Sequence, residues 1–184
     1  MGKPTTIGLP TACDKLLFTP GPLTTSRTVK QAMLRDLGSR DYAFIDVIAD
    51  IRRGLLTVAR ASDAAYEAIP LQGSGTFSIE AVFASFVPRG GRVLIIVNGA
   101  YGHRMVKICE TLGIDTLVCE YPEDQLPDVD EIKGTLAREG DTITDVAVVH
   151  CETTTGLINP IQQIGNVVAA AGARYFVDAM SSFG

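Results

Sequence analysis

The stretch Arg92-Val-Leu-Ile-Ile-Val-Asn-Gly-Ala-Tyr-Gly102 decides the fold class. Its apolar run, 92–97, lacks the alternation of a strand with one face in water, so it predicts a strand covered on both faces. A glycine-flanked loop and a helical pattern from Tyr101 to Leu112 follow directly. A buried strand that passes through a short loop into a helix is the repeating unit of parallel α/β sheets.

The same alternation of strand and helix continues along the chain. We predict further strands over 66–71, 114–119, 145–149 and 175–177, and helices over 76–86 and 161–171. Asp128 with Glu131 predicts the N-cap and N3 pair of another helix, to about Arg138. Ahead of them, Ser26 is expected to cap a short helix to about Leu37, and a longer helix covers about 42–60. The pattern predicts an α/β protein with three layers, α/β/α, around a mostly parallel sheet.

Composition excludes several classes of protein. The 184 residues carry 46% hydrophobic and 20% charged residues, which suits one sizeable core, or one domain and part of another. A net charge of −5 without a basic run argues against nucleic acid as a partner. No apolar stretch reaches the roughly 18 residues of a membrane span, and the N-terminus lacks a secretory h-region. Four scattered cysteines and two distant histidines argue against a metal site and favour a cytoplasmic protein with reduced thiols.

Gly73-Ser-Gly-Thr76 lies between a predicted strand and a predicted helix. Its glycines let the backbone approach a ligand, and a helix N-terminus with two nearby hydroxyls forms a cradle for phosphate. A tight turn capped by Thr76 is an equally good interpretation of this motif alone. A dinucleotide-binding fingerprint fits poorly, since Ser78 takes the third glycine position and Asn98 stands where a ribose-binding acid is expected. A P-loop is excluded because no Gly-Lys-Ser/Thr follows.

Asp178 directly follows the predicted strand 175–177. A carboxylate at the tip of a buried strand is costly unless a cation or a set of hydrogen bonds compensates it. Taken alone, Asp178 is best interpreted as a structural hydrogen-bond acceptor or an N-cap. Because a phosphate-type loop is expected at the same sheet edge, the pair also suits a ligand with a phosphate at one end and a cationic ring nitrogen at the other.

Two other residues are expected at this edge of the sheet. Tyr101 opens a helix after a glycine-flanked loop, and is either a core aromatic or a plate for a flat ring. Thr153 belongs to a run of three threonines and offers a hydroxyl, although strand-end and turn roles explain it as well. His150 is expected to be a hydrogen-bonded core residue rather than a base, and His103 to lie on a helix surface.

Five motifs together resemble a known family. The chain resembles the 2-aminoethylphosphonate–pyruvate transaminases, a branch of the class V aminotransferases of fold type I, which use pyridoxal 5′-phosphate. The resemblance covers the chain from about Leu16 and is carried by Phe18-Thr-Pro-Gly-Pro-Leu-Thr-Thr-Ser-Arg27, Leu71-Gln-Gly-Ser-Gly-Thr76, Asn98-Gly-Ala-Tyr-Gly102, His150-Cys-Glu-Thr-Thr-Thr-Gly156 and Val177-Asp-Ala-Met-Ser-Ser-Phe-Gly184.

The resemblance implies a role for each candidate residue. Tyr101 would stack on the pyridine ring, Thr153 would lie near the ring hydroxyl, and Asp178 would pair with the ring nitrogen and keep it protonated, so that the ring can act as an electron sink. The residues that would hold the cofactor phosphate are Ser74, Gly75 and Thr76. No metal is implied.

The resemblance also implies what lies beyond this sequence. Such enzymes form a Schiff base through a lysine some two dozen residues after the aspartate, so that lysine is expected beyond Gly184, with a substrate-binding arginine and a small domain. We therefore expect an N-terminal arm and short helix in 1–40, a partial cofactor-binding large domain in 41–184, and no catalytic residue within the chain. By itself the chain is expected to be inactive.

The function implied is amino transfer from 2-aminoethylphosphonate to pyruvate, giving phosphonoacetaldehyde and L-alanine in phosphonate catabolism. The expected partners are these small molecules and, for the full-length family member, a second copy in a homodimer. Two alternatives stay open: a fragment of an alanine–glyoxylate or serine–pyruvate type aminotransferase, or a non-catalytic module for cofactor binding or dimerisation.

Overall fold

The computed structural model describes residues 15–19, 21–61 and 64–184. The chain forms two compact units, Met1–Gly54 and Leu55–Gly184. Most of the predicted N-terminal arm lies outside the described residues, as do Cys13 and Pro20. Helix α2 (Tyr42–Val58) spans the division at Gly54. The bounds expected for the arm, 1–40, and for the large domain, 41–184, stay predictions.

The first unit contains α1 (Arg27–Ala32), and Ser26 caps this helix as predicted. The Ser26 side chain accepts a hydrogen bond from the Val29 N–H at 3.3 Å. The helix ends five residues before the predicted Leu37. None of its residues is buried, and short helices without tertiary packing are marginal in water, which accounts for the early end.

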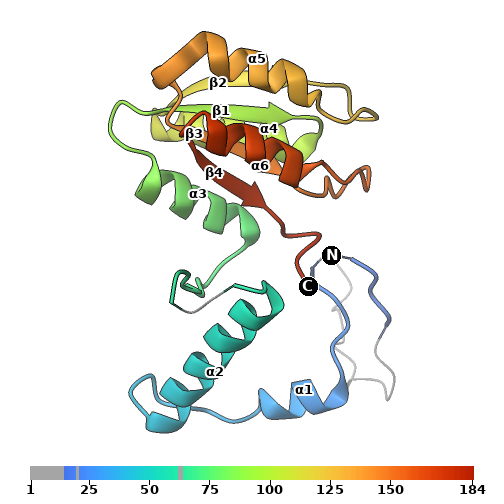
Figure 1. Ribbon diagram of the computed structural model, residues 1–184. Helices are drawn as coiled ribbons and strands as arrows, with labels where there is room; N and C mark the ends of the chain where they lie inside the picture. The colour runs from blue at the N-terminus through green and yellow to red at the C-terminus, as the bar shows by residue number, and fades with distance from the viewer. Residues whose placement is uncertain (1–14, 20, 62–63) are drawn as a thin grey trace, which may run out of the picture. The chain divides into compact units, whose positions relative to one another are not determined.

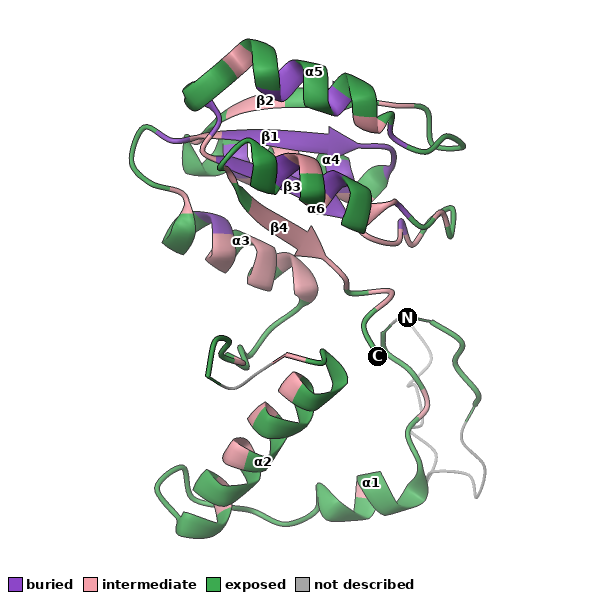
Figure 2. Ribbon diagram, in the orientation of Figure 1, coloured by how far each residue is buried: buried purple, intermediate pink, exposed green. Residues whose placement is uncertain are grey.

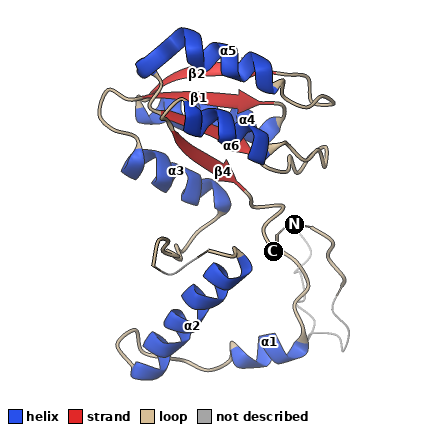
Figure 3. Cartoon of the chain, in the orientation of Figure 1, coloured by secondary structure: helices blue, strands red, loops and turns tan. Residues whose placement is uncertain are grey.

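A four-stranded, wholly parallel sheet lies at the centre of the second unit (Figure 3), and its strand order is β2-β1-β3-β4. Its helices alternate with the strands, and a single 3₁₀ turn, η1 (Gly140–Thr142), precedes β3. The strands are β1 (Arg92–Val97), β2 (Asp115–Glu120), β3 (Asp145–Val149) and β4 (Arg174–Asp178), and the helices are α3 (Gly75–Phe86), α4 (Ala100–Leu112), α5 (Val129–Glu139) and α6 (Ile161–Ala170) (Figure 1).

Two apolar cores lie on opposite faces of this sheet. Successive side chains of β1 from Val93 to Val97 enter opposite cores, as this apolar run predicts. One core packs Leu94 and Ile96 against α5 and α6, and the other packs Val93, Ile95 and Val97 against α3 and α4. The predicted three-layer α/β/α arrangement is confirmed. β1 and β3 are buried along nearly their whole length, whereas β4 at the sheet edge is half-buried (Figure 2).

The predicted strand over 66–71 is wrong. These residues belong to no strand, and no described strand pairs with them. Pro70 lacks a backbone N–H for a ladder, and Tyr66 and Ile69 are exposed. The remaining elements of the second unit begin and end within two residues of the predicted bounds.

Three observations bear on classes of function. Within the described residues, no helix is long and apolar enough to cross a membrane. In the same part of the chain, no group of His, Cys, Asp and Glu is arranged to hold a metal ion. The three described cysteines, Cys109, Cys119 and Cys151, are free thiols, and burial raises the pKa of Cys109 to about 11.

An ion pair joins the starts of β3 and β4. Asp145 is fully buried and receives hydrogen bonds from Arg174 Nε at 2.7 Å and Nη2 at 2.9 Å. The Thr144 hydroxyl donates a third bond to the same carboxylate at 2.6 Å. A buried carboxylate that loses its cation is costly, whereas exposed ion pairs contribute little.

We therefore expect Arg174→Ala to lower the free energy of unfolding by about 2 kcal/mol, since Arg174 is itself partly exposed and water compensates some of the loss. Urea unfolding followed by circular dichroism measures this change. The control is Lys107→Ala, which breaks the exposed Lys107–Glu110 pair and should cost less than about 0.5 kcal/mol. Equal urea midpoints for the two variants would show that the stability of the fold does not depend on the pairing of Asp145 with Arg174.

Candidate functional site

The loops that follow β1, β3 and β4 meet at one edge of the sheet, because parallel strands end on the same side. The His150 N–H donates to the Asp178 carbonyl at 2.8 Å and continues the pairing of β3 and β4 past the last strand residue. The start of α3 lies at the same edge, since a Cβ on Gly75 would stand 3.3 Å from Met180 Cγ. The structure thus brings the phosphate-type turn next to the Asp178 loop.

The turn before α3 is built for a helix start. Gly73 has a φ of +147°, a region that residues with side chains rarely adopt. The N-cap is Ser74, whose side chain accepts from the Phe77 N–H at 3.3 Å, so the alternative of capping by Thr76 is wrong. The Thr76 hydroxyl instead accepts a hydrogen bond from Arg104 Nη1 at 3.4 Å. The remaining free N–H groups of the first turn suit an anion.

Asp178 ends β4 and is half-buried. Its Oδ1 accepts a hydrogen bond from the Met180 N–H at 3.0 Å, as the structural interpretation of this residue predicts. Within the described residues, Asp178 makes no ion pair, and its Oδ2 atom has no hydrogen bond. One oxygen is therefore held by the loop, and the other is free to meet a cation.

Tyr101 is held by a residue that the sequence analysis missed. The fully buried Glu152 accepts hydrogen bonds from the Tyr101 N–H at 3.2 Å and the Gly102 N–H at 2.9 Å. The N-cap of α4, Gly99, has no side chain to cap the helix, and a Cβ there would lie 2.5 Å from Glu152 Cδ. Glu152 thus replaces the missing cap from 50 residues away. The one signal in the sequence was a helix start without its own N-cap side chain.

Two hydroxyl bridges join the loops after β3 and β4. The hydroxyls of Thr153 and Ser181 share a short hydrogen bond, and the Ser182 hydroxyl bonds His150 Nδ1 at 2.9 Å. His150 is hydrogen-bonded as predicted, although it is half-buried rather than part of a core. His103 lies exposed on α4, as predicted, with Nε2 at 3.5 Å from Glu120 Oε1. Thr153 therefore lies beside the Asp178 loop.

A buried amide pair anchors the loop after β1. Asn98 and Asn159 exchange two hydrogen bonds of 2.8 Å between their side chains. The Asn159 side chain also donates to the Val149 carbonyl, and the Asn98 side chain to the Gln125 carbonyl. All four side-chain N–H donors of the two asparagines are thereby hydrogen-bonded inside the fold. Asn98 is consequently a structural residue, which fits the exclusion of a dinucleotide fingerprint.

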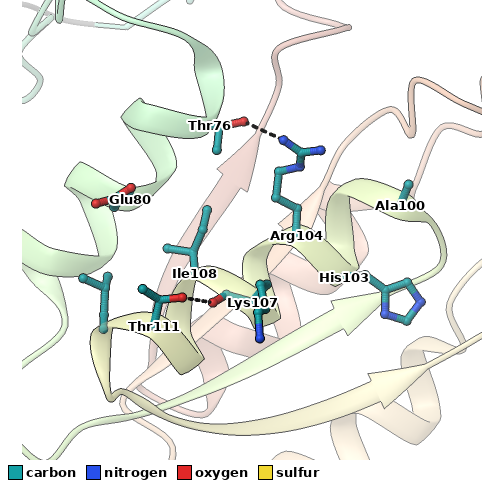
Figure 4. Close-up of a pocket in the computed structure, with 9 residues that line it drawn as sticks. Thr76, Glu80, Ala100, His103, Arg104, Lys107, Ile108 and Thr111 are labelled. Carbon is teal, nitrogen blue, oxygen red and sulfur yellow. Dashed lines mark hydrogen bonds between the residues drawn. The ribbon is translucent and has the colours of Figure 1, made fainter.

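A cavity of about 480 Å³ opens between α3 and α4, beside this edge (Figure 4). Thr76 and Ala100 line its end near the sheet edge, and its wall contains His103 and the charged side chains of Glu80, Arg104 and Lys107. Figure 4 shows Arg104 reaching from α4 to the first turn of α3. The cavity therefore begins at the candidate site and carries more positive than negative side chains.

The six candidate residues, Ser74, Gly75, Thr76, Tyr101, Thr153 and Asp178, all lie on elements or loops at the carboxyl edge of the sheet. Contacts between their loops confirm that they form one neighbourhood. The individual roles assigned to them stay predictions. The arrangement offers neutral donors at the α3 start, an aromatic ring at the α4 start and a carboxylate at the end of β4.

Comparisons with known proteins agree on one family. The model of the family described as aminotransferase class-V matches residues 25–184. A 2-aminoethylphosphonate–pyruvate transaminase of Pseudomonas fluorescens is 47% identical over 93% of this chain, and transaminase 1 of that name from Polaromonas sp. is 49% identical over 93%. The match covers 46% of each relative, so the chain spans about half the length of the curated relatives it matches.

Two solved structures have the same fold. A pyridoxamine–pyruvate aminotransferase from Mesorhizobium loti matches with a TM-score of 0.82 at 29% identity, over 95% of this chain and 44% of that one. An alanine–glyoxylate aminotransferase from Nostoc sp. matches with a TM-score of 0.84 at 29% identity, over 100% of this chain and 47% of that one.

The clamp on the start of α4 gives a direct prediction. The Tyr101 and Gly102 N–H groups bond two different oxygens of Glu152, so in Glu152→Gln one of them faces an NH₂ group instead of an acceptor. We expect the Tyr101 and Gly102 amides to exchange with solvent at least about tenfold faster, as expected for losing a bond to a charged group. Hydrogen exchange followed by NMR or mass spectrometry measures this.

The matched control is Glu123→Gln in an exposed loop, which should leave these amides unchanged. Unchanged exchange in Glu152→Gln would show that the helix start is held by other contacts.

Proposed function

Because the chain belongs to the class V aminotransferases, we propose that it serves in amino transfer from 2-aminoethylphosphonate to pyruvate, giving phosphonoacetaldehyde and L-alanine. The observation that carries the proposal is the 46–49% identity to relatives named for this reaction. Since the chain spans about half of those relatives, we propose that it supplies the cofactor-binding part of the large domain.

The residues at the sheet edge fit pyridoxal 5′-phosphate. A half-buried carboxylate with one free oxygen suits a pyridinium nitrogen, and a glycine-containing helix start suits a phosphate group. Tyr101 is half-buried, so part of its ring is available for stacking. The cavity beside Thr76 leaves room for groups that extend from the phosphate end.

Each residue then has a physical task. When bound, the cofactor supplies an electron sink for the pair left on a substrate carbon that loses a proton. Asp178 holds the proton on the ring nitrogen by charge, and the Met180 N–H holds Asp178 in place. Thr153 would offer its hydroxyl to the cofactor, and the hydrogen bond to Ser181 holds this hydroxyl in place. Ser74, Gly75 and Thr76 hold the phosphate, and Tyr101 keeps water from one face of the ring.

We also propose the cellular setting and assembly that the resemblance implies. The substrates are the small molecules named above, the compartment is the cytoplasm, and the full-length protein is a homodimer. Light scattering on a version extended to the length of its relatives tests the assembly.

An alternative amino donor is alanine, with glyoxylate as the acceptor. The Nostoc sp. alanine–glyoxylate aminotransferase shares the fold closely, with a TM-score of 0.84. Its 29% identity is well below the 47% and 49% of the relatives named for the phosphonate. We therefore favour the phosphonate as donor. In the extended version, a higher kcat/KM for alanine with glyoxylate than for 2-aminoethylphosphonate with pyruvate would reverse this preference.

The other alternative is a non-catalytic module. In that case the extended version would bind the cofactor but would show no turnover with either pair of substrates.

The role of Asp178 is tested by cofactor binding. Asp178→Asn removes the charge that favours a protonated ring nitrogen, so we expect affinity for pyridoxal 5′-phosphate to fall about tenfold or more. Absorbance titration gives the affinity and the protonation state of the bound ring. Asp124→Asn in an exposed loop is the control and should bind as the unchanged chain does. Equal affinities for all three proteins would remove Asp178 from the site.

The chain alone is expected to show no catalytic turnover of the two substrates. Its lysines are Lys3, Lys15, Lys30, Lys107 and Lys133, and none of them follows Asp178. Incubation with both substrates and the cofactor, followed by an assay for alanine, measures the activity. Borohydride reduction and mass spectrometry then show where any cofactor is attached. Turnover together with a single reduced lysine would contradict the expectation.

A further inference from the structure

Arg104 touches two of the residues assigned to the cofactor. Its side chain extends from the second turn of α4 toward the first turn of α3 (Figure 4). Nη1 lies 3.4 Å from the Thr76 hydroxyl, and the guanidinium carbon lies 5.6 Å from the centre of the Tyr101 ring. The second distance is within the range of a cation–π contact. Arg104 thus links the candidate phosphate cradle to the candidate ring plate.

The cradle itself carries no charged side chain. Ser74, Gly75 and Thr76 offer hydroxyls and backbone N–H groups, with the partial positive charge of a helix start. A phosphate monoester carries a charge of about −1.5 to −2 at neutral pH, which these groups match only in part. A cation at the cradle supplies the missing charge.

Arg104 has the capacity to do so. A guanidinium has five N–H donors in a fixed fork, and the long bond to Thr76 uses one of them. Within the described residues Arg104 forms no ion pair, although Glu80 lines the same cavity. By contrast, its neighbours on α4 are engaged, because Lys107 pairs with Glu110 and His103 lies near Glu120. Among the described cationic residues of this wall, Arg104 is therefore the one whose charge no carboxylate contact offsets, and it can bind an incoming anion.

We propose that Arg104 binds the phosphate group of the cofactor, together with Ser74, Gly75 and Thr76. This inference rests on the proposed function, since it takes pyridoxal 5′-phosphate as the ligand. The forked guanidinium meets two phosphate oxygens at once and stays over Tyr101 as it does so. It thereby fixes the phosphate relative to the ring plate.

A tetrahedral phosphorus dianion reaches this site from either of two sources. One is the cofactor phosphate, and the other is the phosphonate of the substrate. The contact with Thr76, a residue of the helix start, favours the cofactor. A purely structural role, in which Arg104 only braces Tyr101, is the third explanation that the experiment must separate.

The test compares two probes that differ only in the phosphate, and 2-aminoethylphosphonate is titrated separately as a third ligand. Pyridoxamine 5′-phosphate and pyridoxamine carry the same ring, and neither forms a Schiff base with lysine. Their affinities for the purified chain are measured by NMR or calorimetric titration up to millimolar concentration. For Arg104→Gln we expect the affinity for pyridoxamine 5′-phosphate to fall about tenfold or more, while pyridoxamine binding changes less than about twofold. Arg104→Lys keeps the charge and should recover part of the loss.

Lys107→Gln is the matched control, because it removes one positive charge from the same cavity wall one turn further along α4. It should leave both affinities within about twofold of the unchanged chain. Thermal unfolding of each variant confirms that the fold is retained, which is expected because Arg104 is an exposed residue.

Three results overturn the assignment of Arg104. An equal loss for both probes would mean that the residue acts only through Tyr101. A loss confined to 2-aminoethylphosphonate binding would move Arg104 to the substrate. Unchanged affinity in Arg104→Gln would remove it from the site. Failure of the unchanged chain to bind pyridoxamine 5′-phosphate would instead overturn the proposed cofactor site itself, and the inference with it.

Discussion

The candidate site depends on one buried carboxylate. Glu152 lies fully inside the fold, and both of its oxygens accept N–H groups from the first turn of α4. A helix start carries a partial positive charge, so it compensates an ionised group that would otherwise be costly to bury. Gly99 leaves the space that the carboxylate occupies. Because Thr153 follows Glu152 directly, this contact sets the positions of the aromatic ring and the neighbouring hydroxyl together.

The surrounding contacts extend this constraint to the other loops. Thr153 bonds Ser181 in the loop after β4, and the Asn98–Asn159 pair ties the loop after β1 to the chain beyond β3. Beneath them, β1 and β3 are buried between two cores, so the ends of these strands cannot shift independently. The loops are therefore irregular in backbone but fixed by side-chain hydrogen bonds that cross between them.

The sequence predicted what depends on local pattern. The apolar run 92–97 indicated a buried strand, and Asp128 indicated a helix start that the structure has, with its side chain accepting two N–H groups. The strand over 66–71 failed because pairing depends on a neighbour that local pattern does not reveal. Glu152 was missed for the same reason, since its donors lie 50 and 51 residues away in sequence. Asp178 was expected at a buried tip, but β4 is an edge strand and leaves it half-buried.

Two charged side chains without an ion pair determine the orientation in which a ligand can bind. Asp178 at the end of β4 and Arg104 beside the α3 start each lack an ion pair within the described part of the chain. Opposite charges left near one site without pairing each other are best satisfied by a ligand that carries the complementary charges at its two ends. A pyridinium nitrogen and a phosphate on one flat ring meet that requirement, with Tyr101, which lies beside Arg104, as the surface for the ring. The polarity of the site thus follows from residues on β4, α3 and α4. The Glu152 contacts and the hydroxyl bridges maintain the relative positions of the α4 start and the loops after β3 and β4.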